Sequence, residues 1–174
     1  MALYFGDIHI HSNFSDGKGS PDDNIRHARD IADLDFAAIT DHAEKLDDKK
    51  WKENKKSMKK YHDPNNFCTL LGFEWTHPYS EIWRPFVDEH KELSEINLPQ
   101  YGHRNIYYKE LNGDYFSRNN SHSDSPKKLW QKLDQQGQRA MSIPHHPASL
   151  PYPVDWPKHN PKYERLVEIY SIWG

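Results

Sequence analysis

Short apolar runs alternate with longer amphipathic stretches over the first 75 residues of the chain. Each apolar run has only a few residues and ends in polar ones, which predicts buried strands at 3–10, 36–40 and 67–75. Helical spacing of apolar positions, together with the helix start at Ser20-Pro21, predicts helices over 20–34 and 47–61. The order strand, helix, strand, helix, strand is typical of parallel strands joined by crossover helices, so the predicted class is α/β.

The pattern changes after residue 75. Residues 76–102 lack clean periodicity and contain three prolines, so we expect a lid-like insertion there. Regular patterns then return and predict strands at 105–109, 139–143 and 166–172, with a helix over 125–136. We therefore expect a single domain over residues 1–174, because this length suits one hydrophobic core and is short for two.

Composition narrows the class of protein. Hydrophobic residues make up 35% and mean hydropathy is -1.05, yet aromatic residues reach 13%, which is too many for a disordered chain. The net charge of -3 gives no strong signal for nucleic acid, and the lysines of 47–61 fit a solvated helix face. The one cysteine, Cys68, excludes an internal disulfide and a cysteine zinc site. No signal peptide or membrane span is recognisable, so the expected location is cytoplasmic.

Polar residues with metal-binding side chains follow each of the first three predicted strands. His9 and His11 alternate at the end of the first strand, and Asp16 lies in the glycine-bearing loop behind it. His42 follows the second strand. Glu74 ends the third in an apolar neighbourhood, where a buried, unpaired carboxylate is costly and a cation partner is the economical explanation.

The second half of the chain adds more residues of this kind. His103 precedes the fourth predicted strand and His146 follows the fifth, so strand after strand brings a ligand to one edge. This recurrence predicts a site for divalent metal ions. Asp41 and His145 are the candidates for moving a proton, and Arg104 is a candidate phosphate clamp because a guanidinium binds two oxygens at once. A salt bridge inside the domain is the alternative role for Arg104.

The ordered motifs carry a family resemblance that runs over essentially the whole chain. Asp7-Ile8-His9-Ile10-His11 and Thr40-Asp41-His42 resemble the first motifs of the PHP (polymerase and histidinol phosphatase) superfamily. Gly72-Phe73-Glu74-Trp75, Pro144-His145-His146-Pro147 and Val167-Glu168-Ile169 resemble more narrowly its uncharacterised DUF3604 branch. The resemblance implies a distorted (β/α)7-type barrel with one to three ions of zinc, manganese or iron.

The resemblance also implies a distribution of ligands. His9 and His11 would hold one ion, Glu74 would bridge to a second ion completed by His103 and His146, and a third ion would take Asp16 and His42. The family pattern closes with a late Asp-x-His pair that this sequence lacks, which suggests a domain that is incomplete at its C-terminus. A barrel of that kind would leave an open sheet edge through which copies of the chain can associate.

These observations predict a metal-dependent phosphoesterase that uses metal-bound hydroxide on a small phosphorylated substrate or a phosphodiester. A metal-binding module without catalysis is the alternative, because the closing Asp-x-His is absent. An amidohydrolase-like enzyme acting on a C–N bond is a second alternative, disfavoured because Glu74 stands where that class uses a lysine bridge. Counting the bound ions separates the first two hypotheses.

Overall fold

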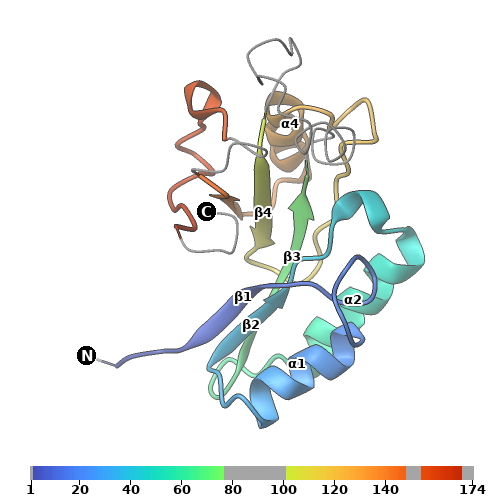
Figure 1. The fold of residues 1–174 in the computed structure, drawn as a ribbon, viewed down its shortest axis with the longest axis vertical. Coiled ribbons are helices and arrows are strands. Elements are labelled where there is room, and N and C mark those ends of the chain that lie inside the picture. The colour runs from blue at the N-terminus through green and yellow to red at the C-terminus, as the bar shows by residue number, and fades with distance from the viewer. Residues whose placement is uncertain (1, 77–100, 148–153, 170–174) are drawn as a thin grey trace, which may run out of the picture.

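The structure, a computed structural model, describes residues 2–76, 101–147 and 154–169. Five strands form one curled sheet, a half-barrel, in the order β1-β2-β3-β4-β5 (Figure 1). Their bounds are β1 Gly6–Ile10, β2 Phe36–Ile39, β3 Cys68–Trp75, β4 His103–Tyr108 and β5 Ala140–His145. The described helices are α1 Pro21–Asp30, α2 Asp48–Tyr61 and α4 Pro126–Gln136, with short 3-10 turns η1 at Ala43–Lys45 and η3 at Trp156–Lys158. The predicted α/β class is confirmed.

The first half of the sheet has the predicted parallel arrangement. β1 pairs in parallel with β2, and β2 with β3. The crossover helices start where the sequence places capping residues: the Ser20 side chain accepts the backbone N–H of Asp23 before α1, and that of Asp47 accepts the N–H of Lys50 before α2. The carboxyl ends of three parallel strands therefore meet at one edge, which is where function gathers in such sheets.

The second half of the sheet differs from the parallel barrel that the resemblance implied. β4 is antiparallel to both β3 and β5. After β4 ends, the chain returns along the sheet before α4 begins. Two contacts mark this path: the indole of Trp51 donates to the Gly113 carbonyl, and the indole of Trp75 donates to the Ser123 carbonyl. Helix α4 then runs back down, so β5 starts opposite the residue where β4 ended, with Tyr108 paired to Ala140.

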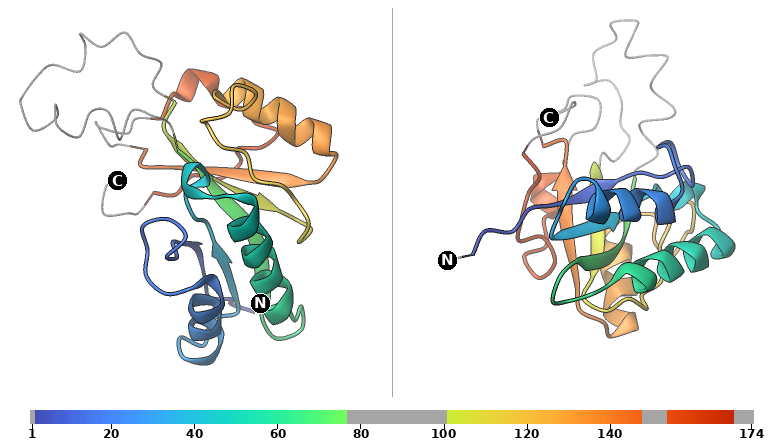
Figure 2. Two further views of the ribbon diagram at one scale, coloured as in Figure 1. Left: turned by 90° about the vertical axis from the view of Figure 1, so that its right-hand side faces the viewer. Right: turned by 90° about the horizontal axis from the view of Figure 1, so that it is seen from below.

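All three helices lie on the same face of the sheet and share its main core (Figure 2). That core includes Ile25 of α1, Trp51 and Met58 of α2, and Leu129 of α4, packed against outward-facing residues of β2, β3 and β4. The opposite, concave face holds a smaller apolar cluster around Ala38, Tyr107 and Ile143. The helix-covered face thus holds most of the core. Polar residues gather at one edge of the sheet, called the upper rim, where β3 and β5 end and β4 begins.

The last described segment runs beside β5 without forming a regular strand. Glu164 makes an isolated parallel bridge to Ser142, and the backbone N–H of Glu168 donates to the Pro144 carbonyl. The strand predicted at 166–172 is therefore present only as an irregular extended segment over 164–168, and residues 170–172 lie outside the described part. The segment nevertheless places Glu168 at the upper rim of the sheet.

Three other expectations concern the insertion after β3, the edge of the sheet at β1 and the absence of membrane-spanning helices. The lid-like insertion predicted at 76–102 lies almost wholly outside the described residues. β1 pairs only with β2 in the described part, and Leu3, Tyr4 and Phe5 beside it are exposed, so association through this edge stays a prediction. Among the helices of the described ranges, none has the length and apolar character needed to cross a membrane.

Candidate metal centre

A β-bulge in β1 places His9 and His11 at the rim. Asp7 pairs with Ala37 and Ile10 with Ile39, so β1 contains one more residue than β2 between these pairs. The Nε2 atoms of His9 and His11 lie 3.6 Å and 2.9 Å from Oε2 of Glu74. Both predicted histidines thus reach the same carboxylate oxygen.

The loop after β1 is held by Asp41, which is fully buried. The carboxylate of Asp41 accepts hydrogen bonds from the Ser12 backbone N–H, the Ser12 hydroxyl and the Ser15 hydroxyl, at 2.7, 2.6 and 2.6 Å. The loop so fixed brings Asp16 to 2.6 Å from Nδ1 of His11. Asp41 therefore positions this loop, and the proton transfer expected of it from the sequence stays a prediction.

Thr76 orients the imidazole of His42. Its hydroxyl lies 2.7 Å from Nδ1 of His42 and donates to Oε1 of Glu74 at 2.9 Å. The hydroxyl has given its own proton to Glu74, so it accepts one from Nδ1 of His42. The lone pair of His42 is then on Nε2, which faces Oδ2 of Asp16 at 3.4 Å.

Glu74 is the centre of the arrangement, with its side chain only 2% exposed. While Oε2 faces the histidines of β1, Oε1 lies 3.0 Å from Nδ1 of His103, 3.3 Å from Nε2 of His145 and 3.4 Å from Nδ1 of His42. The two oxygens of one carboxylate therefore address two different sets of imidazoles. This geometry is compatible with a carboxylate that bridges two cations, and the bridging role implied by the resemblance stays a prediction.

The three histidines of the second half come together although β4 runs antiparallel. His103 begins β4 and pairs with His145 at the end of β5, so both occupy the upper rim. His146 follows with a φ of 59°, a left-handed conformation that a non-glycine residue rarely adopts. Its ring centroid lies 4.5 Å from that of His145 and 5.5 Å from that of His103. Such local strain is typical of functional sites.

Glu168 is a site residue to which sequence reasoning gave no role. Its Oε2 lies 2.8 Å from Nδ1 of His9. The residue stood within a quoted motif, and its place between Val167 and Ile169 in a predicted strand was the available signal. The structure thus provides a late carboxylate at the rim, although the sequence has no closing Asp-x-His.

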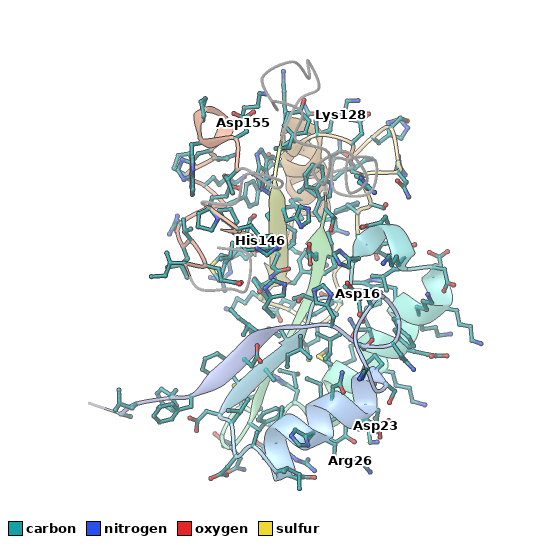
Figure 3. The ribbon with its side chains drawn as sticks, viewed as in Figure 1. Asp16, Asp23, Arg26, Lys128, His146 and Asp155 are labelled. Atoms are coloured by element: carbon teal, nitrogen blue, oxygen red, sulfur yellow. The ribbon has the colours of Figure 1, made fainter. Side chains whose placement is uncertain are left out.

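In the described ranges, the potential ligands form four overlapping groups, each with ligand atoms within 4.8 Å of one another. Figure 3 labels Asp16 and His146, which come from the two halves of the chain and both lie in the central part of the molecule. The groups are His9, His11 and Glu74; His103, His145 and His146; His11, Asp16 and His42; and His9, His145 and Glu168. All seven predicted ligands are included, and His145, predicted as a proton carrier, lies among them.

The charges of the rim fit cations. Burial opposes the charged form of His9, but hydrogen bonds to Glu168 and Glu74 outweigh it and raise the pKa of His9 to about 10. Burial raises the pKa of Glu74, but the imidazoles of His145 and His42 hold it well below its usual range. The carboxylates thus favour positive charge on neighbouring groups, a role that protons or metal ions can fill.

Two deeper imidazoles stay neutral and suit metal binding. Burial lowers the pKa of His145 to about 4 and that of His146 to about 3. Nδ1 of His145 is buried and has no hydrogen-bond partner among the described residues. An orphaned buried nitrogen is costly unless it has a partner, and a neutral imidazole is the form that binds a metal ion.

Arg104 lies away from the ligands. It is fully buried, donates from Nε to Oε1 of Glu164 at 2.8 Å and from a terminal nitrogen to the Tyr101 carbonyl at 2.7 Å. Its guanidinium carbon lies 5.6 Å from the ring centroid of Trp75, a residue of the main core. The arrangement observed is the internal salt bridge, the alternative role considered for Arg104.

Comparison with known proteins gives a family but no activity. Residues 44–149, more than half of the chain, match the model of the DUF3604 family, described as a protein of unknown function. An uncharacterised protein of Chlamydia pneumoniae is 25% identical over 178 residues, which cover 99% of this chain and 25% of that protein. The chain thus spans about a quarter of the length of this relative. No solved structure matches the chain.

These findings correct the wider assignment made from the motifs. The PHP superfamily assignment was wrong: the matching model is that of a family of unknown function, and the relative is uncharacterised. The described sheet is a five-stranded half-barrel with two antiparallel pairings, which differs from the (β/α)7-type barrel expected. The chain belongs to the DUF3604 family.

Proposed function

We propose that this chain is a metal-dependent hydrolase of phosphate esters. The observation that carries the proposal is the bridging position of Glu74, whose two oxygens face two separate sets of imidazoles. Overlapping ligand groups imply ions only a few ångströms apart, the spacing of two-metal sites that clamp the attacking and leaving oxygens of a phosphate. Imidazole and carboxylate ligands suit zinc, manganese or iron.

The charge balance of the rim supports an anionic substrate. The cluster contains three carboxylates, those of Asp16, Glu74 and Glu168. Two or three divalent ions would exceed this negative charge and leave a net positive site. When bound, such ions lower the pKa of water and stabilise charge on phosphate oxygens.

The residues of the chain have separate tasks in this proposal. Glu74 holds the two halves of the cluster together, Thr76 presents Nε2 of His42, and Asp41 fixes the loop that carries Asp16. The Asp16 side chain is 53% exposed, so water and substrate can approach from that side. The side chains of His103, His145 and His146, in contrast, are buried.

The test combines metal counting with turnover. Protein stripped with a chelator and reloaded with manganese or zinc should hold two or three ions per chain, the number that the overlapping groups allow. It should then hydrolyse p-nitrophenyl phosphate or its diester. His9→Ala should lower both metal content and turnover, whereas His122→Ala, an exposed histidine outside the ligand groups, should change neither.

Two results would count against the proposal. A fully loaded chain that hydrolyses no member of a broad panel of phosphate monoesters and diesters would leave only the metal-binding module. Turnover that survives complete chelation would exclude a role for metal. The module without catalysis has less support than the sequence gave it, because Glu168 supplies a late carboxylate beside His9.

A further inference from the structure

A buried amide lies directly below the proposed metal centre. Asn105 of β4 pairs with Glu74 of the neighbouring strand β3 (Figure 1) and is 0% exposed. Residues that are directly opposite in an antiparallel pair point to the same face, with their Cβ atoms about 4.5–5.5 Å apart. The side chain of Asn105 therefore stands beside the carboxylate that all the surrounding imidazoles face.

The neighbours of Asn105 place its amide between two environments. Side chains alternate along a strand, so His103 and Tyr107 share the concave face of the sheet with Asn105. His103 belongs to the ligand groups, whereas Tyr107 belongs to the small apolar cluster of that face. On the other side Asn105 pairs with Ile143, a further member of this cluster. The amide thus lies where the ligands end and the apolar floor begins.

Neither polar atom of this amide makes a hydrogen bond within the described residues. Burial raises the pKa of the Tyr107 hydroxyl, and Asn105 is close enough to oppose that rise, but without the geometry of a hydrogen bond. The hydroxyl instead donates to the Ile8 carbonyl at 2.8 Å. A buried amide without hydrogen bonds costs free energy, so its presence at this position requires a reason.

In the described part of the chain, Nδ1 of His145 also lacks a hydrogen bond. His145 pairs with His103, so it stands one diagonal step from Asn105 on the same concave face. Its Nε2 lies 3.3 Å from Oε1 of Glu74, within the cluster. A histidine that binds metal through one ring nitrogen almost always donates from the other to an oxygen acceptor. The unpaired nitrogen and the unused amide oxygen therefore belong to neighbouring side chains.

Position distinguishes Asn105 from another buried amide, that of Asn54. Asn54 is also 0% exposed, and its two polar atoms lack hydrogen bonds among the described residues. It lies on α2, which packs on the helix-covered face, and it belongs to the surroundings of the main core. Asn105, in contrast, stands opposite Glu74 and beside His145. The two asparagines thus form a matched pair for an experiment.

We propose that Asn105 is a positioning residue of the metal centre, whose Oδ1 accepts the Nδ1–H of His145 directly or through one enclosed water molecule. This hydrogen bond fixes the tautomer and the ring orientation in which Nε2 of His145 faces Glu74. The inference rests on the metal-binding part of the proposed function and does not require catalysis. It adds an amide to a centre otherwise described by its histidines and carboxylates.

The first experiment compares zinc affinity with the stability of the metal-free chain. Asn105→Leu should bind zinc about 10- to 100-fold more weakly than the wild type, the range for changes to the partners of metal ligands. Asn54→Leu should bind zinc as the wild type does. Each substitution replaces a buried, unpaired amide by an apolar group of similar shape, so neither should lower the urea midpoint of the metal-free chain.

A purely structural role of Asn105 predicts the opposite result, a lower urea midpoint with unchanged zinc affinity. Competition with a chelating dye measures the affinity, and chemical denaturation of the stripped protein measures the midpoint. Asn105→Ala, which adds no bulk, replaces Asn105→Leu if that variant does not fold, and the same loss of zinc affinity is expected of it.

The second experiment observes the hydrogen bond itself. NMR of the zinc-loaded chain with ¹⁵N-labelled histidines should show a slowly exchanging Nδ1 proton for His145, which shifts in Asn105→Leu and not in Asn54→Leu. Equal zinc affinity in the two variants, or an Nδ1 resonance that Asn105→Leu leaves in place, would overturn the inference. Tight zinc binding without hydrolysis of phosphate esters would contradict the proposed function alone. Hydrolysis combined with equal zinc affinity in the two variants would overturn the inference alone.

Discussion

The proposed metal binding depends most strongly on a single carboxylate, that of Glu74. Within the part of the chain that the structure describes, Glu74 is the one residue whose oxygens contact histidines from both halves, at 2.9 Å to His11 and 3.0 Å to His103. A carboxylate can share its charge between two cations, whereas an amide of the same shape cannot. We therefore expect metal binding to respond more strongly to substitution of Glu74 than to substitution of any one imidazole.

Glu74→Gln keeps the size of this side chain and removes its charge. We expect it to weaken metal binding by more than about 100-fold, because changes to outer partners of metal ligands already reach that range. Elemental analysis after dialysis against the metal measures the effect. Glu110→Gln, at an exposed position, is the matched control, and equal metal content in the two variants would contradict the bridging role.

We expect the hydroxyl of Thr76 to orient the imidazole of His42 for metal binding, in addition to packing beside it. Thr76→Val preserves shape but removes the partner of His42 Nδ1, so the third ion should bind about 10- to 100-fold more weakly. Thr76→Ser should restore most of this affinity because it keeps the hydroxyl. Titration of the stripped protein with zinc, with thermal melting as a folding control, separates the two variants. Equal weakening in both would indicate a packing effect.

Residue-level prediction succeeded where a side chain is unusual for its place. Histidines and acids at the ends of apolar strands stand out, so seven ligands could be named from the sequence, and the structure brings all seven together. Thr76 and Glu168 are ordinary residues whose roles come from contacts, in the case of Glu168 with a residue 159 positions away. Arg104 was assigned by its neighbour His103, but adjacent strand residues face opposite sides.

At the scale of elements, the loop after β1 depends on one glycine. A Cβ on Gly17 would lie 2.0 Å from the backbone oxygen of His11, which cannot move away without opening the loop. Gly17→Ala should therefore displace Asp16 and destabilise the fold by about 1–3 kcal/mol. Urea unfolding measures the loss, and Lys18→Ala, at an exposed site, should be nearly neutral. A stable Gly17→Ala variant with full metal content would refute this account of the loop.

Helix α4 holds the segment that carries Glu168. Asp134 of α4 accepts hydrogen bonds from Lys162 and from the Tyr163 hydroxyl, and the ring of Tyr163 stacks on Trp130 at 5.1 Å. The hydrogen bond from Lys162 lowers the pKa of Asp134. A lowered pKa means that the contribution to stability is present above the unfolded value of about 4 and is lost as pH falls through the folded value.

This linkage predicts a pH-dependent difference between two variants of the chain. The wild type should be more stable than Asp134→Asn at pH 6, and the difference should vanish near pH 2. Urea unfolding at a series of pH values gives the difference directly, and it cancels the titration of all other carboxyls. A difference that stays constant with pH would show that the ionised Asp134 contributes nothing.

The sequence did not predict that β4 runs antiparallel to its neighbours. The first three strands follow one another with a helix between each pair, and their parallel order was correctly inferred. The signal for the reversal was His103, which lies at the start of its strand, whereas Glu74 lies at the end of β3. The path of residues 109–125, fixed by contacts to Trp51 and Trp75, has no periodicity from which its direction could be inferred.

For the whole molecule, the buried salt bridge between Arg104 of β4 and Glu164 links the last described segment, residues 154–169, to the sheet. Both side chains are almost fully buried, so removal of one partner leaves a buried charge without compensation. Arg104→Met should lower the free energy of unfolding by about 3–5 kcal/mol, and the double variant Arg104→Met with Glu164→Met should recover part of it.

The control for this pair is the exposed ion pair of Arg26 and Asp23 on α1, far from the metal centre in Figure 3. Arg26→Met should change stability by less than about 1 kcal/mol. Chemical denaturation of the three variants and the wild type provides the comparison. If Arg104→Met is no more damaging than Arg26→Met, the last segment is held by other contacts.

The contact of His9 with Glu168 has a consequence for the order of synthesis. The two residues are 159 positions apart, so on the ribosome His9 is made roughly 8 to 30 s before its partner at about 5–20 residues per second. A nascent chain already carries the imidazoles of β1 during that interval, but not the carboxylate of Glu168 or the imidazole of His145, with which His9 forms a potential ligand group. In the proposed centre, the groups completed by His145, His146 or Glu168 can therefore bind a metal ion only late in synthesis, whereas the group of His9, His11 and Glu74 is complete much earlier.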